Sequence, residues 1–340
     1  MRLPDRANPS VAGPAAEGGD PSPSCRTRRE DLGALGRSLK QELARTLAEL
    51  VPRGSPAVFL DYPVHSNLGD HLIRLATEKW LRDEEIEVAG LWNLQNFRHP
   101  PLPEGTTLLL QGGGNFGDLY PQQPFREGVV RRYPHNRIVF LPQAVHYRDP
   151  DRAAAATAVL SAHPRLTILL RDRRSLEAAR RHFPDCDLRL APDMASWLHP
   201  WDVNPAGRGG GTATAGTLYL LRRDLELRSG QETPDCGPGW RGDWRDLLGH
   251  RYWRLRLLKA AGYVLPAGAM AAASRREAEL AVARCADRFR QHDLVVSSRL
   301  HGFLLACLLE IPGVLLDNSY GKNHAYFQTW FPRFTPPAGG

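Results

Sequence analysis

The apolar residues of this chain form short runs separated by stretches with helical spacing. Runs suited to buried strands occur at residues 57–60, 107–110, 138–141 and 166–170. The helical spacing between them predicts helices at 71–83, 151–162 and 173–181. Strands that alternate with helices are typical of a parallel sheet covered by helices on both faces. We therefore predict a doubly wound α/β domain, Rossmann-like in type, over residues 56–200.

A second series of the same kind follows the segment "WDVNPAGRGGGTATAG" at residues 201–216. Its Pro, Gly and Thr content is typical of an interdomain linker. Beyond it we expect strands at 217–221, 294–297 and 314–316, with helices at 277–290 and 300–309. The pattern predicts a smaller Rossmann-like domain over 217–332 and a short tail at 333–340. Two such domains would face a cleft at the carboxyl ends of their strands, where this fold class binds ligands.

The N-terminal region divides into two parts. Residues 1–28 are rich in Pro, Gly, Ser and Ala, and we predict that they form a disordered tail. Leucines then recur at positions 32, 35, 39, 43, 47 and 50, which predicts an amphipathic helix within residues 29–55. We favour a helix that packs on the first domain over one that adheres to a membrane.

Composition and charge narrow the class of partner. The 340 residues carry a formal net charge of +7, and their arginines are spread along the whole chain. This spread favours an acidic small substrate or an anionic membrane surface over nucleic acid, for which no binding signature is present. The longest apolar stretch, 303–316, is interrupted by Glu310 and Pro312 and is too short to span a bilayer.

The five cysteines are scattered and never form a C-x-x-C pair. Reduced thiols in a cytoplasmic protein, with no metal site, are the expected state. The N-terminus lacks the apolar segment of a signal peptide. We predict a cytoplasmic location. Peripheral association with the inner face of the plasma membrane is a second option that we consider.

Two matching tetrapeptides each follow a predicted strand. They are Asn67-Leu68-Gly69-Asp70 and Asn115-Phe116-Gly117-Asp118. Their glycines permit positive φ or the close approach of a ligand, and their Asn and Asp side chains suit helix capping or contact with a substrate hydroxyl. Capping explains one copy well, and two copies at equivalent positions favour a ligand role. We take Asp70 and Asp118 as candidate proton acceptors, and Asn67, Gly69, Asn115 and Gly117 as acceptor-binding candidates.

The second copy extends backward to "GGGNFG" at residues 112–117, which satisfies G-x-G-x-x-G after a strand. A dinucleotide site also needs an acidic residue at the end of the next strand, whereas this strand ends in Leu141-Pro142-Gln143. We therefore interpret Gly114 and its neighbours as a loop that approaches a different anion or a sugar. No cofactor is predicted.

Basic residues follow two further strands. Arg171 directly follows the strand at 166–170 and precedes a helix, a position where a guanidinium can hold a carboxylate or phosphate. Arg223 and Asp224 follow the strand at 217–221 as a second candidate pair. An internal salt bridge from Arg223 to Asp224 or Glu226 explains that cluster equally well.

The segment "VVSSRLHG" at 295–302 carries the strongest candidates. A buried strand delivers Arg299 and His301 to the start of a helix, with Gly302 behind them. An anion-binding group and a group that titrates near neutral pH thus arrive together, which favours acid-base chemistry by His301. The next strand ends in "DNSYGKN", where Lys322 is placed to reach a phosphate and Asn318 is a loop candidate.

These motifs resemble the polysaccharide pyruvyltransferase family. The matching segments are "HSNLGDHLI", "LLLQGGGNFGD", "LRDRRS", "LYLLRRDLE" and "SSRLHGFLLACLLEIPGVLLDNSYGKNHAYFQTW". They occur in order over roughly residues 56–330, and the last is the most specific.

The resemblance implies two Rossmann-like domains arranged as in GT-B glycosyltransferases. It also implies phosphoenolpyruvate as donor and, as acceptor, a hexose of an exopolysaccharide or a lipid-linked oligosaccharide. By motif, Arg299 and Arg171 match donor-binding arginines, His301 matches a catalytic histidine, and Lys322 is a further donor contact. The product would be a pyruvate ketal, with phosphate released.

Two rival hypotheses remain at this point. A nucleotide-sugar-dependent glycosyltransferase would share the fold and the basic cleft, and a noncatalytic glycan or polyanion binder would use the same arginines without turnover. A second copy of the chain, in a homo-oligomer, is a further partner that we consider.

Overall fold

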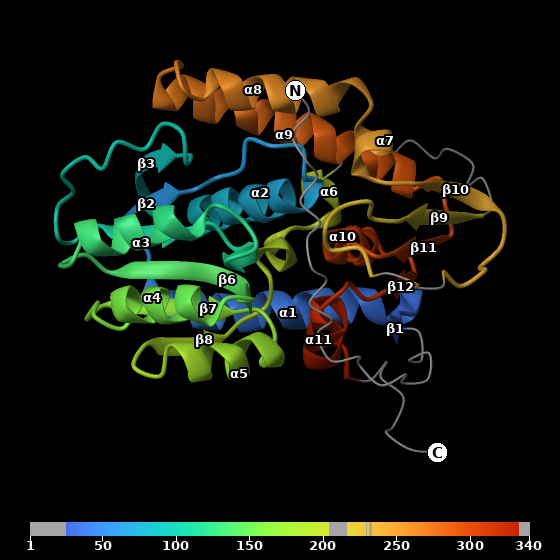
Figure 1. Ribbon diagram of the computed structural model, residues 1–340. Helices are drawn as coiled ribbons and strands as arrows, with labels where there is room; N and C mark the ends of the chain where they lie inside the picture. Colours follow the sequence, from blue (N-terminus) through green and yellow to red (C-terminus); the bar gives the residue numbers. More distant parts are fainter. Residues whose placement is uncertain (1–24, 204–215, 229, 231–232, 333–340) are drawn as a thin grey trace, which may run out of the picture.

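The computed structural model describes residues 25–203, 216–228, 230 and 233–332, which form a mixed α/β molecule with two largely parallel sheets (Figure 1). The larger sheet has the order β3-β2-β4-β6-β7-β8, and β5 pairs with β6. Its strands are β2 (Pro56–Leu60), β3 (Glu87–Trp92), β4 (Thr107–Leu110), β5 (Gly113–Gly117), β6 (Ile138–His146), β7 (Leu166–Leu170) and β8 (Asp187–Leu190). The four strands expected from apolar runs in this part are confirmed.

Side chains alternate between the two faces of this sheet. One face packs on α3 (Gln123–Arg132), α4 (Pro150–Leu160) and α5 (Arg173–His182). The other packs on α1 (Arg29–Leu50) and α2 (Leu68–Asp83). Leu108 and Leu110 point to the first face, and Leu109 points to the second. Both faces are therefore buried, which explains the continuous apolar runs of these strands.

The smaller sheet has the order β1-β12-β11-β9-β10. Its strands are β1 (Cys25–Arg26), β9 (Thr217–Leu220), β10 (Gly239–Gly242), β11 (Leu294–Ser297) and β12 (Gly313–Leu315). Its helices are α7 (Trp244–Leu248), α8 (His250–Ala261), α9 (Ala267–Phe289), α10 (Leu300–Leu308) and α11 (Lys322–Trp330). The strands and helices predicted in this part are confirmed, and α9 begins ten residues before its predicted start at residue 277.

Strand order fixes where a ligand can bind. In chain order, β2-β3-β4-β6-β7 are arranged 2-1-3-4-5, and β9-β10-β11-β12 are arranged 2-1-3-4. In each sheet, the direction in which successive strands are added therefore reverses at one point. This point lies between β2 and β4 in the larger sheet and between β9 and β11 in the smaller. Ligands of doubly wound folds bind beyond the carboxyl ends of the strands at such a point.

The N-terminal segment corrects one boundary. We predicted a disordered tail over residues 1–28, but Cys25 and Arg26 form β1, which pairs antiparallel with β12. Residues 1–24 and the predicted tail at 333–340 lie outside the described residues. So do residues 204–215 of the predicted linker, whose first residues belong to α6 (Pro200–Val203).

The leucines of α1 are buried in the core. Leu43 and Leu47 are fully buried, and α1 packs on α10 and on the short 3-10 helix η1 (Met194–Trp197). The apolar face of α1 is thus covered by protein, which confirms the packing helix and leaves no apolar face for a membrane. No helix in the described part of the chain is long and apolar enough to cross a bilayer.

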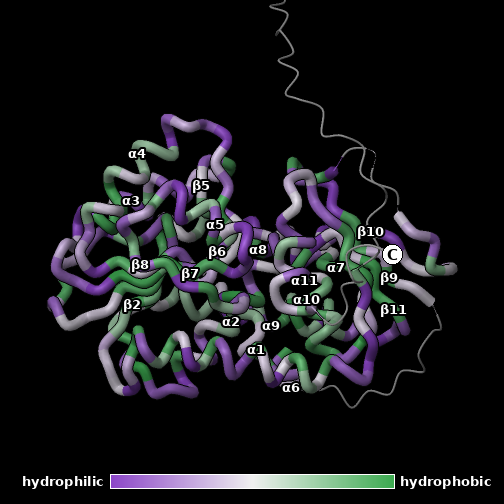
Figure 2. Tube along the Cα trace, turned by 90° about the horizontal axis from the view of Figure 1, so that it is seen from below, coloured by the Kyte–Doolittle hydropathy of each residue, from purple (hydrophilic) through white to green (hydrophobic). Residues whose placement is uncertain are grey.

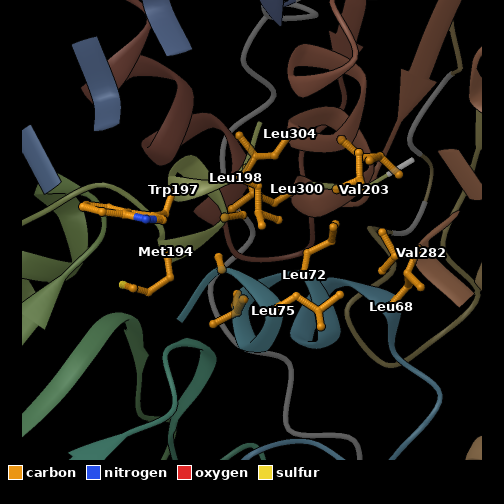
Figure 3. Close-up of a cluster of buried hydrophobic side chains, with 14 of the residues drawn as sticks. Leu68, Leu72, Leu75, Met194, Trp197, Leu198, Val203, Val282, Leu300 and Leu304 are labelled. Atoms are coloured by element: carbon orange, nitrogen blue, oxygen red, sulfur yellow. The ribbon is translucent and has the colours of Figure 1, made fainter. Parts of the chain in front are cut away.

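The two sheets share one hydrophobic core. Side chains from α2, η1, α9 and α10 meet where the sheets adjoin, among them Leu72, Trp197 and Leu304 (Figure 3). Hydropathy along the chain follows this arrangement, with apolar strands inside and many hydrophilic segments at the periphery (Figure 2). This shared core fixes the two sheets relative to each other, so that the carboxyl ends of their strands border the same pocket.

Candidate active site

A pocket of about 640 Å³ lies at the carboxyl ends of the strands of both sheets. Its walls come from the loops after β2, β5 and β7 on one side and from those after β9, β10, β11 and β12 on the other. Four acidic side chains line it, against seven basic ones: Arg171, Arg222, Arg223, Arg245, Lys259, Arg299 and Lys322. The excess of basic groups suits a ligand with more than one negative charge.

Two of these cations meet at Gly114. A β-carbon placed on Gly114 would lie 3.1 Å from Arg171 Nη2 and 3.1 Å from Lys322 Nζ. Arg171 follows β7, and Lys322 begins α11 beside β12, so each sheet supplies one cation. Two like charges this close repel each other, and an anion between them relieves that repulsion. The absence of a side chain at Gly114 keeps this position open.

A buried carboxylate joins Arg171 to His301. Asp193 Oδ2 accepts from Arg171 Nη1 at 2.9 Å and lies 3.2 Å from His301 Nε2. Burial by itself raises the pKa of Asp193, but the neighbouring His301 and Arg171 hold it well below its usual value. Asp193 is therefore an anion that fixes the guanidinium and orients the imidazole through its Nε2–H.

The second ring nitrogen of His301 faces Gly69. A β-carbon on Gly69 would lie 2.6 Å from His301 Nδ1. Gly69 stands in the first turn of α2, where Asn67 caps the helix by accepting from the Gly69 N–H at 3.3 Å. The first tetrapeptide thus supplies a helix cap, and its glycine allows the close approach of His301. The approach of a ligand to Gly69 stays a prediction.

Lys322 lies in a strongly coupled cluster. Its Nζ is 2.5 Å from Glu226 Oε2, which also accepts from Arg222 Nη1 at 2.5 Å. Burial lowers the pKa of Lys322 to about 8, with Glu226 opposing this change and Arg222 and Arg171 adding to it. Lys322 is thus a cation that titrates close to the physiological range. Tyr120 completes the cluster by donating to Glu226 Oε1 at 2.8 Å.

Arg299 lines the pocket but is paired with protein carboxylates. Its Nε and Nη2 donate to the two oxygens of Asp243, and Nη2 is also 2.9 Å from Asp224. These contacts use one edge of the guanidinium. The predicted donor contact of Arg299 therefore depends on its remaining N–H groups.

The salt bridge that we considered for Arg223 is wrong. Arg223 pairs with Asp246 at 3.2 Å, whereas Asp224 pairs with Arg222 and Arg299. The cause is the position of β10, which places Asp246 of α7 next to the loop after β9. Both Arg223 and Asp224 line the pocket.

Part of each tetrapeptide reaches the pocket. Asp70 lines it and accepts from Asn67 Nδ2 at 2.8 Å, with His65 Nε2 at 3.4 Å. Asn115 also lines it, and its side-chain oxygen accepts from the buried Arg126 at 2.6 Å. Asp70 is therefore the carboxylate of the larger sheet that is placed to meet a ligand.

Besides Gly69, which packs against His301 and does not line the pocket, three predicted candidates are not among the pocket-lining residues. Asp118 accepts backbone N–H bonds from Arg148 and Asp149, and so orders the turn before α4. Gly117 has φ 135° and lies against the backbone of His146, because residues 113–117 form β5. We predicted a loop there, and that prediction is wrong.

The third is Asn318, which is buried. Its side chain accepts the Lys322 N–H at 2.9 Å and donates to Glu226 at 3.4 Å. Asn318 therefore holds the start of α11 and does not meet the pocket directly.

From the sequence we did not propose Asp193, Glu226 or Asp61 as site residues. Asp193 comes three residues after β8, so the strand-end rule could have found it had β8 been predicted. Asp61 directly follows β2 with φ 64°, and burial raises its pKa to about 6. Among the described residues, no group of three His, Cys, Asp or Glu side chains is placed to hold a metal ion.

Comparisons with known proteins identify the family of this chain. A family model described as polysaccharide pyruvyl transferase matches residues 67–320. EpsO of Bacillus subtilis, which carries a provisional pyruvyl transferase name, is 35% identical over 303 residues, 86% of this chain and 90% of EpsO. Pyruvyl transferase 1 of Schizosaccharomyces pombe is 28% identical over 287 residues, 80% of this chain and 68% of that protein.

A solved structure supports the fold. The crystal structure of an uncharacterized protein from Klebsiella pneumoniae superposes with a TM-score of 0.55 at 18% identity, covering 87% of this chain and 96% of that one. The family model spans the strand ends that carry Asp70, Arg171, Arg299 and His301. The chain therefore belongs to the polysaccharide pyruvyl transferase family and is a pyruvyltransferase.

Proposed function

We propose that the protein transfers the enolpyruvyl group of phosphoenolpyruvate to a hexose of an exopolysaccharide or lipid-linked oligosaccharide, forming a pyruvate ketal. The observation that carries this proposal is the convergence of Arg171 and Lys322 at Gly114, beside His301. Phosphoenolpyruvate carries a carboxylate and a phosphate, and the pocket supplies cations from both sheets to hold them. The shared strand order supports two Rossmann-like units facing the pocket as in GT-B enzymes.

His301 is the proposed general acid. With Nε2–H held by Asp193, protonated His301 gives its Nδ1 proton to the methylene carbon of the donor, and the adjacent carbon becomes a cation. One sugar hydroxyl adds to that carbon and gives its proton to a base, for which Asp70 is placed. A second hydroxyl then displaces phosphate from the same carbon and closes the ketal, and its proton returns to His301, which is neutral after the first step. No cofactor takes part in this scheme.

Phosphate release tests the proposal directly. We expect phosphate only when phosphoenolpyruvate and an acceptor glycan are both present, and a pyruvyl mass gain on the acceptor by mass spectrometry. In thermal shift assays phosphoenolpyruvate should stabilise the protein and nucleotide sugars should not. Stabilisation by a nucleotide sugar with no effect of phosphoenolpyruvate would instead support a glycosyltransferase. Donor binding without phosphate release on any acceptor would support a noncatalytic binder.

Gly114→Ala should weaken donor binding while the fold persists. The new methyl group would occupy the position between Arg171 Nη2 and Lys322 Nζ, and we expect about a tenfold loss of donor affinity, because a charge-assisted hydrogen bond is worth about 1.5–3 kcal/mol. The control is Gly128→Ala in α3, where an added β-carbon meets nothing within 4 Å. Calorimetric titration with phosphoenolpyruvate measures both. Equal affinity in the two variants would place the anion elsewhere.

The pH dependence of kcat/KM for the donor should show the deprotonation of Lys322. Because burial lowers its pKa to about 8 in the free protein, Lys322 loses its charge as the pH rises through 8, and kcat/KM for the donor should fall above that pH. Lys322→Arg keeps a positive charge throughout this range, so its profile should lack that alkaline decline. A decline that persists unchanged in Lys322→Arg would assign it to another group.

A further inference from the structure

Exposed apolar side chains gather on α8 and the turn that follows it. Across the part of the chain that the structure describes, nine large hydrophobic residues are exposed, and five of them fall within residues 253–265. We name these five the α8 patch: Trp253, Leu257, Tyr263, Val264 and Leu265. Val264 is 81% exposed and Leu257 is 71% exposed. This concentration marks an interaction surface, because scattered single residues would need no explanation.

Packing within the molecule does not explain the patch. Helix α8 lies at one edge of the molecule over α9, and Leu255 is its fully buried side chain (Figure 1). Trp253 and Leu257 are four residues apart and turn outward together. The side of the helix that faces away from the core therefore carries large apolar side chains together with exposed basic ones.

The charge of α8 indicates the partner. The helix carries Arg251, Arg254, Arg256 and Lys259 and has no acidic residue. Arg251 and Arg254 pair with Glu277 of α9, while Arg256 lies over the Trp253 ring at 5.7 Å. A helix with aromatic and aliphatic residues on one face and Lys or Arg beside them is typical of binding at the interface of an anionic membrane.

The patch adjoins the pocket. Tyr252 and Lys259 of α8, and Arg245 just before it, line the pocket, whereas Trp253 and Leu257 do not. A surface on which α8 rests would therefore lie next to the pocket entrance. A lipid-linked acceptor anchored in that surface would have a short path to the donor site.

We propose that the α8 patch docks on an anionic lipid bilayer, with Trp253, Leu257 and Val264 entering the interface and the neighbouring cations contacting lipid phosphates. A second copy of this chain fits the patch less well. A two-fold contact through α8 would bring the basic side chains of two identical helices together, and neither helix has an acidic residue to pair with them. The proposal goes beyond pyruvyl transfer, and binding to vesicles is measured without donor or acceptor.

Vesicle flotation tests the docking. Vesicles of equal parts phosphatidylglycerol and phosphatidylcholine should carry the intact protein, and vesicles of phosphatidylcholine alone should carry much less. The double variant Trp253→Ser/Leu257→Ser should bind the anionic vesicles roughly tenfold more weakly, because two apolar side chains that insert are lost. Its matched control, Trp201→Ser/Val88→Ser, removes exposed apolar residues elsewhere and should float like the unaltered protein.

Two further measurements separate the alternatives. The melting temperature and phosphate release on a water-soluble acceptor should be unchanged in the double variant, which would show that fold and chemistry are intact. The proposal is overturned if the unaltered protein does not float, or if the double variant floats equally well. It is also overturned if sedimentation shows a dimer that the double variant converts to monomer, since a second copy would then cover the patch.

Discussion

His301→Ala should leave a folded protein that binds phosphoenolpyruvate but turns over roughly 10² to 10⁴ times more slowly, because positioned proton transfer typically contributes that much. The side chain sits between Asp193, which contacts Nε2, and Gly69, where an added β-carbon would lie 2.6 Å from Nδ1. In the proposed mechanism Arg171 and Lys322 hold the donor, so donor affinity should change little. Single-turnover phosphate release and donor titration on the same variant measure the two effects separately.

The matched control for this experiment is His163→Ala. His163 is 9% exposed, as His301 is, but it contacts the carbonyl of Tyr133 at the end of α3, and neither residue lines the pocket. Its removal should lower the melting temperature and leave the rate per folded molecule near normal. If folded His301→Ala also turns over within a few fold of the unaltered protein, His301 is structural and another group protonates the donor.

The sequence predicts the central strands well because parallel strands buried on both faces are continuous apolar runs. Strands β4, β7 and β11 fall at the residues expected from such runs. Strand β5 could not be predicted in this way, since "GGNFG" has low strand propensity and its extended backbone depends on pairing with β6. Strand β8 alternates Asp187 and Arg189 with leucines, a pattern typical of a sheet edge that we did not recognise.

The candidate site, like the fold, could be predicted only in part. The rule that ligands meet the carboxyl ends of parallel strands found Arg171, Arg299 and His301, all of which line the pocket. It did not reveal that Asp193 and His301, 108 residues apart in the chain, form one hydrogen-bonded pair. It also could not show that Arg299 is paired with Asp243, because that contact depends on the position of β10, which pairs with β9 and leads into Asp243 at the start of α7. Local patterns thus locate strand ends, and tertiary packing decides which side chains face the ligand.

Asp193→Asn should lower turnover about as much as loss of His301 itself. The substitution preserves size but removes the charge that stabilises protonated His301 and orients its ring, and loss of such a carboxylate lowers rates by up to roughly 10⁴. It also leaves the buried Arg171 without its anion. Breaking a buried pair in this way typically costs about 3–5 kcal/mol of the free energy of unfolding. The control Asp187→Asn removes an exposed carboxylate of β8 and should change neither quantity by much.

A double-mutant cycle separates a positioning role from a merely structural one. If Asp193 acts through His301, adding Asp193→Asn to His301→Ala should reduce turnover of the folded protein only slightly further, because residues that act as a unit are not additive. If Asp193 only stabilises the fold, single Asp193→Asn should lower the melting temperature while its folded fraction keeps near-normal kcat. Rates normalised to the folded fraction therefore decide between the two roles. Full additivity of the two substitutions would rule out the proposed coupling between Asp193 and His301.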